Sequence, residues 1–183
     1  MRIIAGEFRS RRLEAPQGLT TRPTLDKVRE AVFSSLGGSF EGGNVLDLYA
    51  GSGANGLEAL SRGMEKAYFV DNDRRAVSAI RKNIASLGVQ KNTKVLCMAD
   101  TKALALLKEE GVRFSLIYMD PPYAKQKNSL ILSLISEYEL LEEGGYAVIE
   151  SLKEDEFRED YPHLKYERDR VYGISRITYC RGV

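Results

Sequence analysis

The segment VLDLYAGSGANG, residues 45–56, joins a short apolar run to the start of a helical pattern. Residues 45–48 are typical of a buried strand, and residues 55–62 are typical of a helix that ends at Gly63. Gly51, Gly53 and Gly56 match G-x-G-x-x-G, which between a strand and a helix is typical of a nucleotide-binding loop. The segment therefore predicts an α/β fold that binds a ligand at the carboxyl end of a strand.

The rest of the chain repeats this order of strand and helix. The predicted strands cover 45–48, 67–70, 94–98, 114–119 and 145–150, and the predicted helices cover 55–62, 73–87, 101–108 and 128–138. Two more strands, 164–170 and 174–180, follow each other without a helix between them. Repeated strand–helix units form parallel sheets, whereas a terminal hairpin adds an antiparallel strand. We therefore expect a Rossmann-like, mostly parallel seven-stranded sheet with an antiparallel C-terminal strand and helices on both faces.

The N-terminal region is more basic than the rest of the chain. Residues 1–29 contain seven basic and three acidic residues, although the whole chain has a net charge of only +1. Residues 2–5 and 11–14 flank Gly6 and are predicted to pair as a hairpin. Because a lone hairpin is marginal in water, this one must pack against the rest of the protein or against a ligand. The arginines at and after the turn, Arg9, Arg11 and Arg12, are suited to gripping phosphates. We expect residues 1–19 to form a basic hairpin arm and residues 20–183 to form the main domain.

A helix is predicted directly after this arm. Thr24 is a good N-cap, and Leu25, Val28, Val32 and Leu36 recur at helical spacing. Gly37-Gly38 is expected to end the helix.

Composition favours a soluble globular protein. The chain has 183 residues, of which 43% are hydrophobic and 29% charged, and no apolar run approaches the roughly 18 residues of a membrane helix. The N-terminus lacks the apolar segment of a signal peptide, and the isolated Cys97 and Cys180 suit a reducing cytosol. The chain has one histidine, His163, which argues against a histidine-based metal site or a Ser-His-Asp triad. We expect a cytoplasmic protein without a metal.

Three acidic residues lie at the ends of the first three predicted strands: Asp47, Asp71 and Asp100. The glycine pattern alone would suggest an NAD-dependent oxidoreductase, but a carboxylate at Asp47 would repel a diphosphate. It suits S-adenosylmethionine, which carries an ammonium and a sulfonium. Asp71 would then accept hydrogen bonds from the ribose hydroxyls and Asp100 from the adenine amino group. The predicted cofactor site consists of Asp47, Gly51, Gly53, Asp71, Asn72, Asp100 and Thr101.

The predicted catalytic loop is Asp120-Pro121-Pro122-Tyr123, which follows the fourth strand. The two prolines prevent both a continuing strand and an immediate helix, so they leave a stiff loop. The Asp120 carboxylate and the Pro121 carbonyl could accept hydrogen bonds from an exocyclic amine and direct its lone pair at a methyl donor. Tyr123 would stack on a base taken out of its stack, and Lys125 and Lys127 would hold phosphates.

Several motifs carry a resemblance to a known family. They are MRIIAG at 1–6, TRPT at 21–24, VREA at 28–31, DLYAGSG at 47–53, GLEALSRG at 56–63 and DPPY at 120–123. Together they resemble the bacterial 16S ribosomal RNA guanine-N2 methyltransferases of the RsmD family, over nearly the whole chain. The last motif alone is shared by enzymes that methylate amines of DNA adenine, RNA guanine or protein glutamine.

The resemblance implies a class I methyltransferase fold, S-adenosylmethionine as donor with S-adenosylhomocysteine as product, and methylation of guanine 966 in 16S ribosomal RNA. It also implies that the substrate is an assembly intermediate of the small ribosomal subunit. For this chain it implies that Asp47, Gly51 and Gly53 line the methionine end of the cofactor. We expect a monomer.

Some alternatives stay open at this point. Arg22 and Thr24 are included among the substrate-binding residues, but they could instead close over the cofactor or form a capped turn. The chain could methylate another target such as adenine in DNA, bind NAD as an oxidoreductase, or act as an RNA-binding assembly factor without catalysis.

Overall fold

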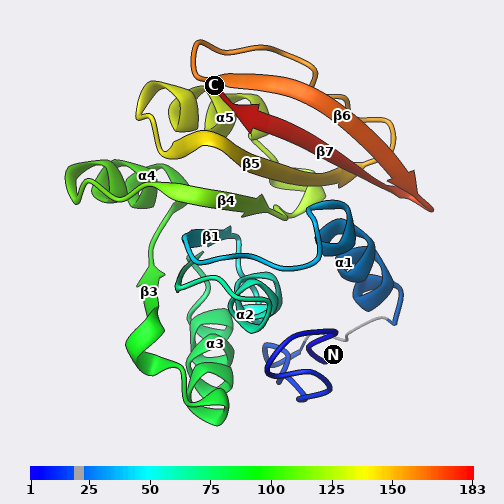
Figure 1. Ribbon diagram of the computed structural model, residues 1–183, viewed down its shortest axis with the longest axis vertical. Coiled ribbons are helices and arrows are strands. Elements are labelled where there is room, and N and C mark those ends of the chain that lie inside the picture. The colour runs from blue at the N-terminus through cyan, green and yellow to red at the C-terminus, as the bar shows by residue number, and fades with distance from the viewer. Residues whose placement is uncertain (19–22) are drawn as a thin grey trace. The chain divides into compact units, whose positions relative to one another are not determined.

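The computed structural model of the chain describes residues 1–18 and 23–183, with the side chains of Pro23 and Thr24 outside the description. The described chain divides into two compact units, Met1–Met98 and Ala99–Val183. Each unit contains strands and helices of its own, and each is described separately below (Figure 1).

The first unit holds three parallel strands in the order β3-β2-β1. Its elements are α1 (Pro23–Ser35), β1 (Asn44–Leu48), α2 (Ala54–Ser61), β2 (Lys66–Asp71), α3 (Arg74–Leu87), the 3₁₀ turn η1 (Gln90–Asn92) and β3 (Thr93–Cys97). In the register, Asp47 of β1 lies opposite Phe69, and Asp71 lies opposite Cys97. The carboxyl ends of the three strands therefore lie along one edge of this part of the sheet.

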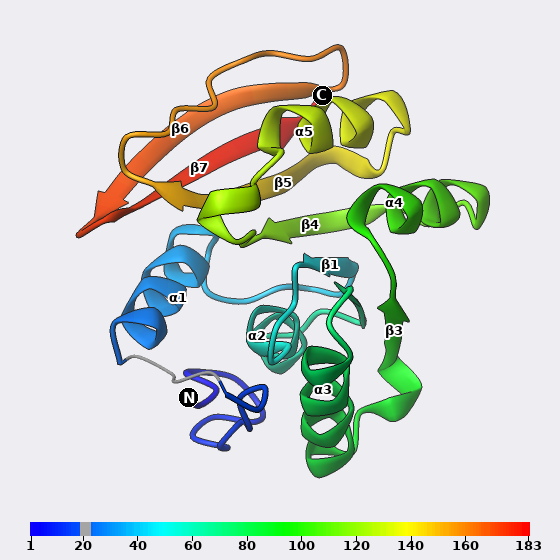
Figure 2. The same ribbon diagram turned by 180° about the vertical axis from the view of Figure 1, so that it is seen from behind.

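Helices α2 and α3 lie side by side, and α3 packs beside β3, as the front and back views both show (Figure 2). The core contains Leu46, Leu57, Phe69 and Ile80, each fully buried. Helix α3 begins at the Asp73 cap, whose side chain accepts a hydrogen bond from the Arg75 N–H, and ends at Gly88 with a φ of 71°. Both ends of α3 are those predicted from the sequence.

The second unit holds four strands in the order β4-β5-β7-β6. Its elements are α4 (Asp100–Glu109), β4 (Phe114–Met119), the 3₁₀ turn η2 (Tyr123–Lys125), α5 (Asn128–Glu137), β5 (Leu141–Leu152), β6 (Leu164–Tyr172) and β7 (Ser175–Gly182). Strands β4 and β5 are parallel, whereas β7 runs antiparallel to both of its neighbours. The predicted fold class, a mostly parallel seven-stranded α/β sheet with an antiparallel C-terminal strand, is confirmed.

Several predicted boundaries differ from the structure by one or two residues. Two other predictions, the start of α1 and the length of β5, are wrong for physical reasons. Helix α1 begins at Pro23, so Thr24 lies inside the helix instead of capping it, because proline is favoured in the first turn, where its missing N–H costs nothing. Strand β5 extends over Leu141–Leu152, well beyond the predicted 145–150, because it pairs with β4 on one side and along its second half with β7 on the other.

The predicted pairing of residues 2–5 with 11–14 is present in a short form. Arg2 and Arg12 form an isolated antiparallel bridge, and the Ile3 N–H donates to the Arg11 carbonyl at 3.0 Å. The segment packs against α2 of the same unit. The Glu58 carboxylate accepts from the N–H groups of Ile4 and Ala5 at 2.9 and 3.1 Å. The support expected for a marginal hairpin is thus provided by the body of the first unit.

Among the helices of the described residues, none is long and apolar enough to cross a membrane.

Candidate functional site

The glycine loop between β1 and α2 has the backbone conformation that its sequence predicts. Gly51 and Gly53 have φ values of 58° and 80°, in the left-handed region that favours glycine. Gly56 is needed for a different reason, since a Cβ there would lie 2.4 Å from the Phe69 ring, so α2 packs directly on β2. Tyr49, with a φ of 67°, is a left-handed residue that is not glycine, and no sequence pattern identified it. Strain of this kind clusters at ligand sites.

Asp47 is the most unusual acidic group of the first unit. Its side chain is fully buried, and its Oδ2 accepts a hydrogen bond from the Gly56 N–H at 2.9 Å. Its Oδ1 has no hydrogen-bond partner among the described residues. The pKa of Asp47 is raised to about 8, chiefly by burial and in smaller part by the nearby Asp71 carboxylate, against the lowering effects of the Gly56 N–H and Arg29.

An unpartnered carboxylate oxygen in this position fits a cationic ligand group. The ammonium of a methionine-derived cofactor would supply both the missing hydrogen bond and the missing charge. Because the oxygen is buried, a ligand reaches it only if a neighbouring group moves.

Asp71, at the end of β2, shapes the loops around it. Its Oδ2 accepts from the Gly51 N–H and its Oδ1 from the Asp73 N–H, both at 2.9 Å. Each oxygen retains a lone pair for another donor. The neighbouring Asn72 is exposed. The structure thus brings Asp47, Gly51, Gly53 and Asp71 together in the first unit.

Two polar residues that the sequence patterns did not assign connect this loop to the N-terminal segment. The Asn83 side chain, on α3, donates to the carbonyls of Ser52 and Glu14, each at 2.9 Å, and accepts from the Glu14 N–H at 2.8 Å. Glu58, on α2, binds residues 4 and 5 and also the Arg62 guanidinium at 2.8 Å. Asn83 and Glu58 are polar residues on otherwise apolar helix faces, and this pattern could have identified both from the sequence.

The diproline loop belongs to the second unit and follows β4 without an intervening residue. Asp120 is half-buried, Pro121 is buried, and Pro122 is exposed. The Pro122 carbonyl accepts from the Lys125 N–H at 3.0 Å, which closes the short η2 turn. Tyr123 is 38% exposed, and its hydroxyl lies 3.3 Å from the Ser175 hydroxyl of β7. The loop therefore presents a carboxylate and an anchored aromatic ring at the end of a strand.

Asp100 is the first residue of α4, not the last residue of a strand. Its Oδ1 accepts from the Thr101 N–H at 2.7 Å and from the Lys127 ammonium at 3.0 Å. Lys127, predicted to hold a phosphate, thus forms an ion pair with a carboxylate predicted to bind adenine. Lys125 is exposed to solvent. The structure brings Asp100, Thr101 and Lys127 together in the second unit.

The remaining predicted residues lie in or near the N-terminal segment. Arg9, Arg11 and Arg12 are exposed, and the Arg11 guanidinium donates to the Ser86 carbonyl at 2.6 Å. Arg22 and the side chain of Thr24 lie outside the described residues. Within the described part of the chain, no group of three or more His, Cys, Asp or Glu residues could hold a metal ion.

Comparisons with known proteins extend over most of the chain. A family model described as "Conserved hypothetical protein 95" matches residues 1–181. The putative rRNA methyltransferase YlbH of Bacillus subtilis is 41% identical over 178 residues, which are 97% of either chain. The ribosomal RNA small subunit methyltransferase D of Escherichia coli is 36% identical over 152 residues, which cover 83% of this chain and 72% of the relative.

A solved structure also resembles this chain over its whole length. The putative methyltransferase yhhF from Escherichia coli matches with a TM-score of 0.83 and 30% identity, covering 100% of this chain and 97% of that structure.

Proposed function

Because this chain belongs to the RsmD family, we propose that it transfers a methyl group from S-adenosylmethionine to the exocyclic N2 amine of a guanine in 16S ribosomal RNA. The resemblance of the motifs directs the proposal to guanine 966 and to an assembly intermediate of the small ribosomal subunit as substrate. The names of the relatives from Bacillus subtilis and Escherichia coli support RNA methylation over the oxidoreductase alternative.

The observation that carries the proposal is the loop Asp120–Tyr123 at the end of β4. An amine on a base is a poor nucleophile because its lone pair is delocalised into the ring. A half-buried carboxylate and a proline carbonyl are acceptors for its two N–H groups. The amine needs no strong base before attack, so the loop contributes by positioning the amine.

The other residues of the loop are suited to holding the base. Tyr123 is exposed enough to offer a ring face, while the contact between its hydroxyl and Ser175 fixes the far end of the ring. Stacking of this kind stabilises bases that have left their stack. Lys125, which is exposed two residues later, is available to a phosphate.

The cofactor half of the proposal rests on the first unit. When bound, S-adenosylmethionine supplies a methyl group made electrophilic by its sulfonium. Asp47 would pair with the ammonium through its unpartnered Oδ1, and Asp71 would accept from the ribose while it keeps the Gly51 N–H in place. Because both residues also bond to the loop backbone, the loop is already shaped before a ligand arrives.

The proposal is tested by the Asp120→Ala variant. Methyl transfer to small-subunit particles from cells that lack this protein should fall by at least about 10²-fold, the usual cost of losing a group that acts in the transition state. S-adenosylhomocysteine binding and thermal unfolding should stay as in the wild type, since Asp120 lies at a loop and outside the cofactor loop of the first unit.

The matched control is Asp155→Ala, which removes a carboxylate from another loop of the second unit. Transfer should be unaffected there. Full activity of Asp120→Ala, or a methyl group found on DNA instead of the particle RNA, would refute the proposal.

A further inference from the structure

One part of the first unit is strongly basic, and the proposed chemistry does not use it. Residues 74–98 include six basic residues and no acidic residue. Four of them, Arg74, Arg75, Arg81 and Lys82, lie on α3. A solvated helix usually mixes charges of both signs, so a run of a single sign on one element points to an anionic partner.

The arginines are arranged on the solvent side of α3. The other side of the helix is buried and includes Ile80, Ile84 and Leu87. Arg74 and Arg81 are exposed, and neither side chain has an ion-pair or hydrogen-bond partner within residues 1–18 and 23–183. The two acidic neighbours of this surface are already engaged, Asp73 with Arg75 at 2.8 Å and Glu14 with Lys82 at 3.5 Å.

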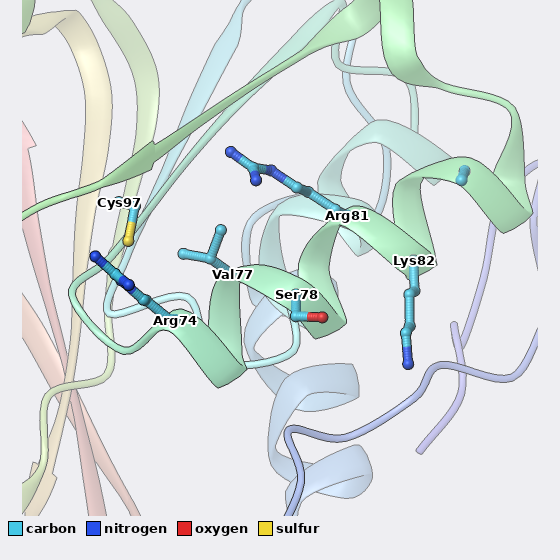
Figure 3. A pocket seen from close by; sticks show the side chains of 7 residues that line it. Arg74, Val77, Ser78, Arg81, Lys82 and Cys97 are labelled. Atoms are coloured by element: carbon cyan, nitrogen blue, oxygen red, sulfur yellow. The ribbon is translucent and has the colours of Figure 1, made fainter.

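Arg74 and Arg81 border a hollow of about 530 Å³ beside the end of β3 (Figure 3). Val77 and Cys97 contribute apolar and weakly polar lining. In Figure 3, Arg74 and Val77 extend toward Cys97, whereas Lys82 points the other way. Two guanidinium groups around an apolar surface can hold phosphate oxygens bidentately and also stack on a base.

A neighbouring hollow shares Arg74 and Lys82 with the first one and reaches the N-terminal arm. This second hollow, of about 520 Å³, is lined by Arg74, Arg75 and Lys82 of α3 together with Glu14, Ala15 and Gln17 of the arm. At the other end of α3, the Arg11 guanidinium donates a hydrogen bond to the Ser86 carbonyl. The arm and α3 thus form one basic surface, and its charge is opposite to that of an RNA backbone.

From these observations we propose that the α3 surface, defined as Arg74, Arg81 and the hollow with Val77 and Cys97, is a second contact for the RNA backbone of the substrate. This inference rests on the proposed function for the identity of the partner. The contact would add affinity without selecting the target base, because phosphate contacts carry no sequence information.

Cys97 offers a direct readout of this contact. It is an exposed free cysteine in the lining of the hollow. Cys180 is buried, and burial raises the pKa of its thiol to about 12, so iodoacetamide alkylates it far more slowly. Alkylation of Cys97 should slow about tenfold when small-subunit particles are present at about ten times their Kd, as expected for occupancy of a covered site. Peptide mass spectrometry gives the rate for each cysteine.

The second measurement uses the double variant Arg74→Gln/Arg81→Gln. Its RNA affinity should fall roughly tenfold, and its salt slope should decrease by about 0.7–0.9 for each phosphate that the variant no longer binds. The turnover number at saturating particles and the affinity for S-adenosylhomocysteine should be unchanged. The matched control, Lys102→Gln/Lys165→Gln, removes the same charge from exposed lysines of the second unit and should leave RNA binding as it is.

Two results would overturn the inference: alkylation of Cys97 that saturating particles do not slow, or an arginine double variant that binds RNA like the lysine control. Either result leaves the proposed function intact if wild-type transfer is normal. Conversely, protection of Cys97 alongside undiminished transfer by Asp120→Ala would support the surface and refute the chemistry.

Discussion

At the scale of single residues, Asp47 combines burial with an incomplete set of partners. Its carboxylate has one hydrogen bond, from Gly56, and one oxygen without a partner among the described residues. Keeping an ionised carboxylate in such a place costs free energy, and the raised pKa of about 8 expresses that cost. A residue of this kind stabilises the protein less than an uncharged side chain would, unless a cation binds beside it.

The Asp47→Asn variant separates these two effects. Between pH 4 and about 8 the folded wild type holds a proton that the unfolded chain has released, so its stability falls as the pH rises through this window. Residue 47 does not titrate in the variant. The Tm of the variant should therefore exceed that of the wild type by more at pH 8 than at pH 5, by about 2–4 °C for each kcal/mol of unfolding free energy that the wild type loses. Scanning calorimetry at several pH values measures this advantage.

The same substitution that raises stability should lower the affinity for the cofactor product. The variant should lose most of its affinity for S-adenosylhomocysteine, and the wild-type affinity should rise from about pH 6 to about pH 8 as Asp47 ionises. Equal affinity of both proteins at every pH would show that Asp47 serves only the loop.

The sequence predicted that Asp47 and Asp71 would flank the glycine loop, because strand ends and glycine spacing are local patterns. It could not predict that Asp71 would bond to the Gly51 N–H, nor that Asn83 would bridge Ser52 and Glu14. Such contacts join residues that are distant in the chain, and no periodicity records them.

At the scale of elements, α2 does more than follow the glycine loop. One face carries Glu58 and Ser61, which bind the N-terminal arm through its backbone. The Ser61 carbonyl accepts from the Glu7 N–H at 2.8 Å, and its hydroxyl donates to the Ala5 carbonyl at 2.6 Å. The motif at 56–63 that carries the family resemblance is therefore, in part, a docking surface for the arm.

The Gly6→Ala variant tests this docking. Gly6 has a φ of 85°, and a Cβ there would lie 1.8 Å from the Ser61 carbonyl oxygen, so the arm must lift from α2. Trypsin should then cut after Arg9, Arg11 or Arg12 faster, by roughly tenfold for each 1.4 kcal/mol by which the docking free energy is weakened.

Gly18→Ala is the matched control. Gly18 has nearly the same φ, 84°, but a Cβ there would meet nothing within 4 Å. Its cleavage rate should stay close to that of the wild type. If both variants are cut equally fast, backbone strain and not the contact with Ser61 determines the docking.

The elements themselves were largely predictable from hydrophobic periodicity and capping residues. The α3 boundaries were predicted because Asp73 and Gly88 are local signals. The start of α1 and the length of β5 were missed because they depend on a proline in the first turn and on pairing with distant strands.

At the scale of the whole molecule, charge is divided unequally between the two units. Residues 1–98 contain 15 basic and 10 acidic residues, whereas residues 99–183 contain 12 and 16. The net charge of +1 for the whole chain hides the basic stretch of α3 and β3, because the acidic second unit offsets it. The sequence therefore predicted a basic arm but not its continuation along α3.

The arm should contribute measurably to RNA binding. Changing Arg9, Arg11 and Arg12 together to Gln should weaken binding to small-subunit particles and lower the salt slope by about 0.7–0.9 for each phosphate that is no longer neutralised. Filter binding across a series of potassium chloride concentrations gives the slope. An unchanged slope would mean that these arginines serve the fold alone.

The way the arm is fastened also has a consequence for how the chain folds. Its partners lie far along the sequence: Glu58 is 54 residues from Ile4, Asn83 is 69 residues from Glu14, and Ser86 is 75 residues from Arg11. During synthesis, residues 2–14 leave the ribosome well before α2 and α3 exist to receive them. Closing such long loops is slow compared with forming a local helix, so this early-made segment settles only after the helices have been built.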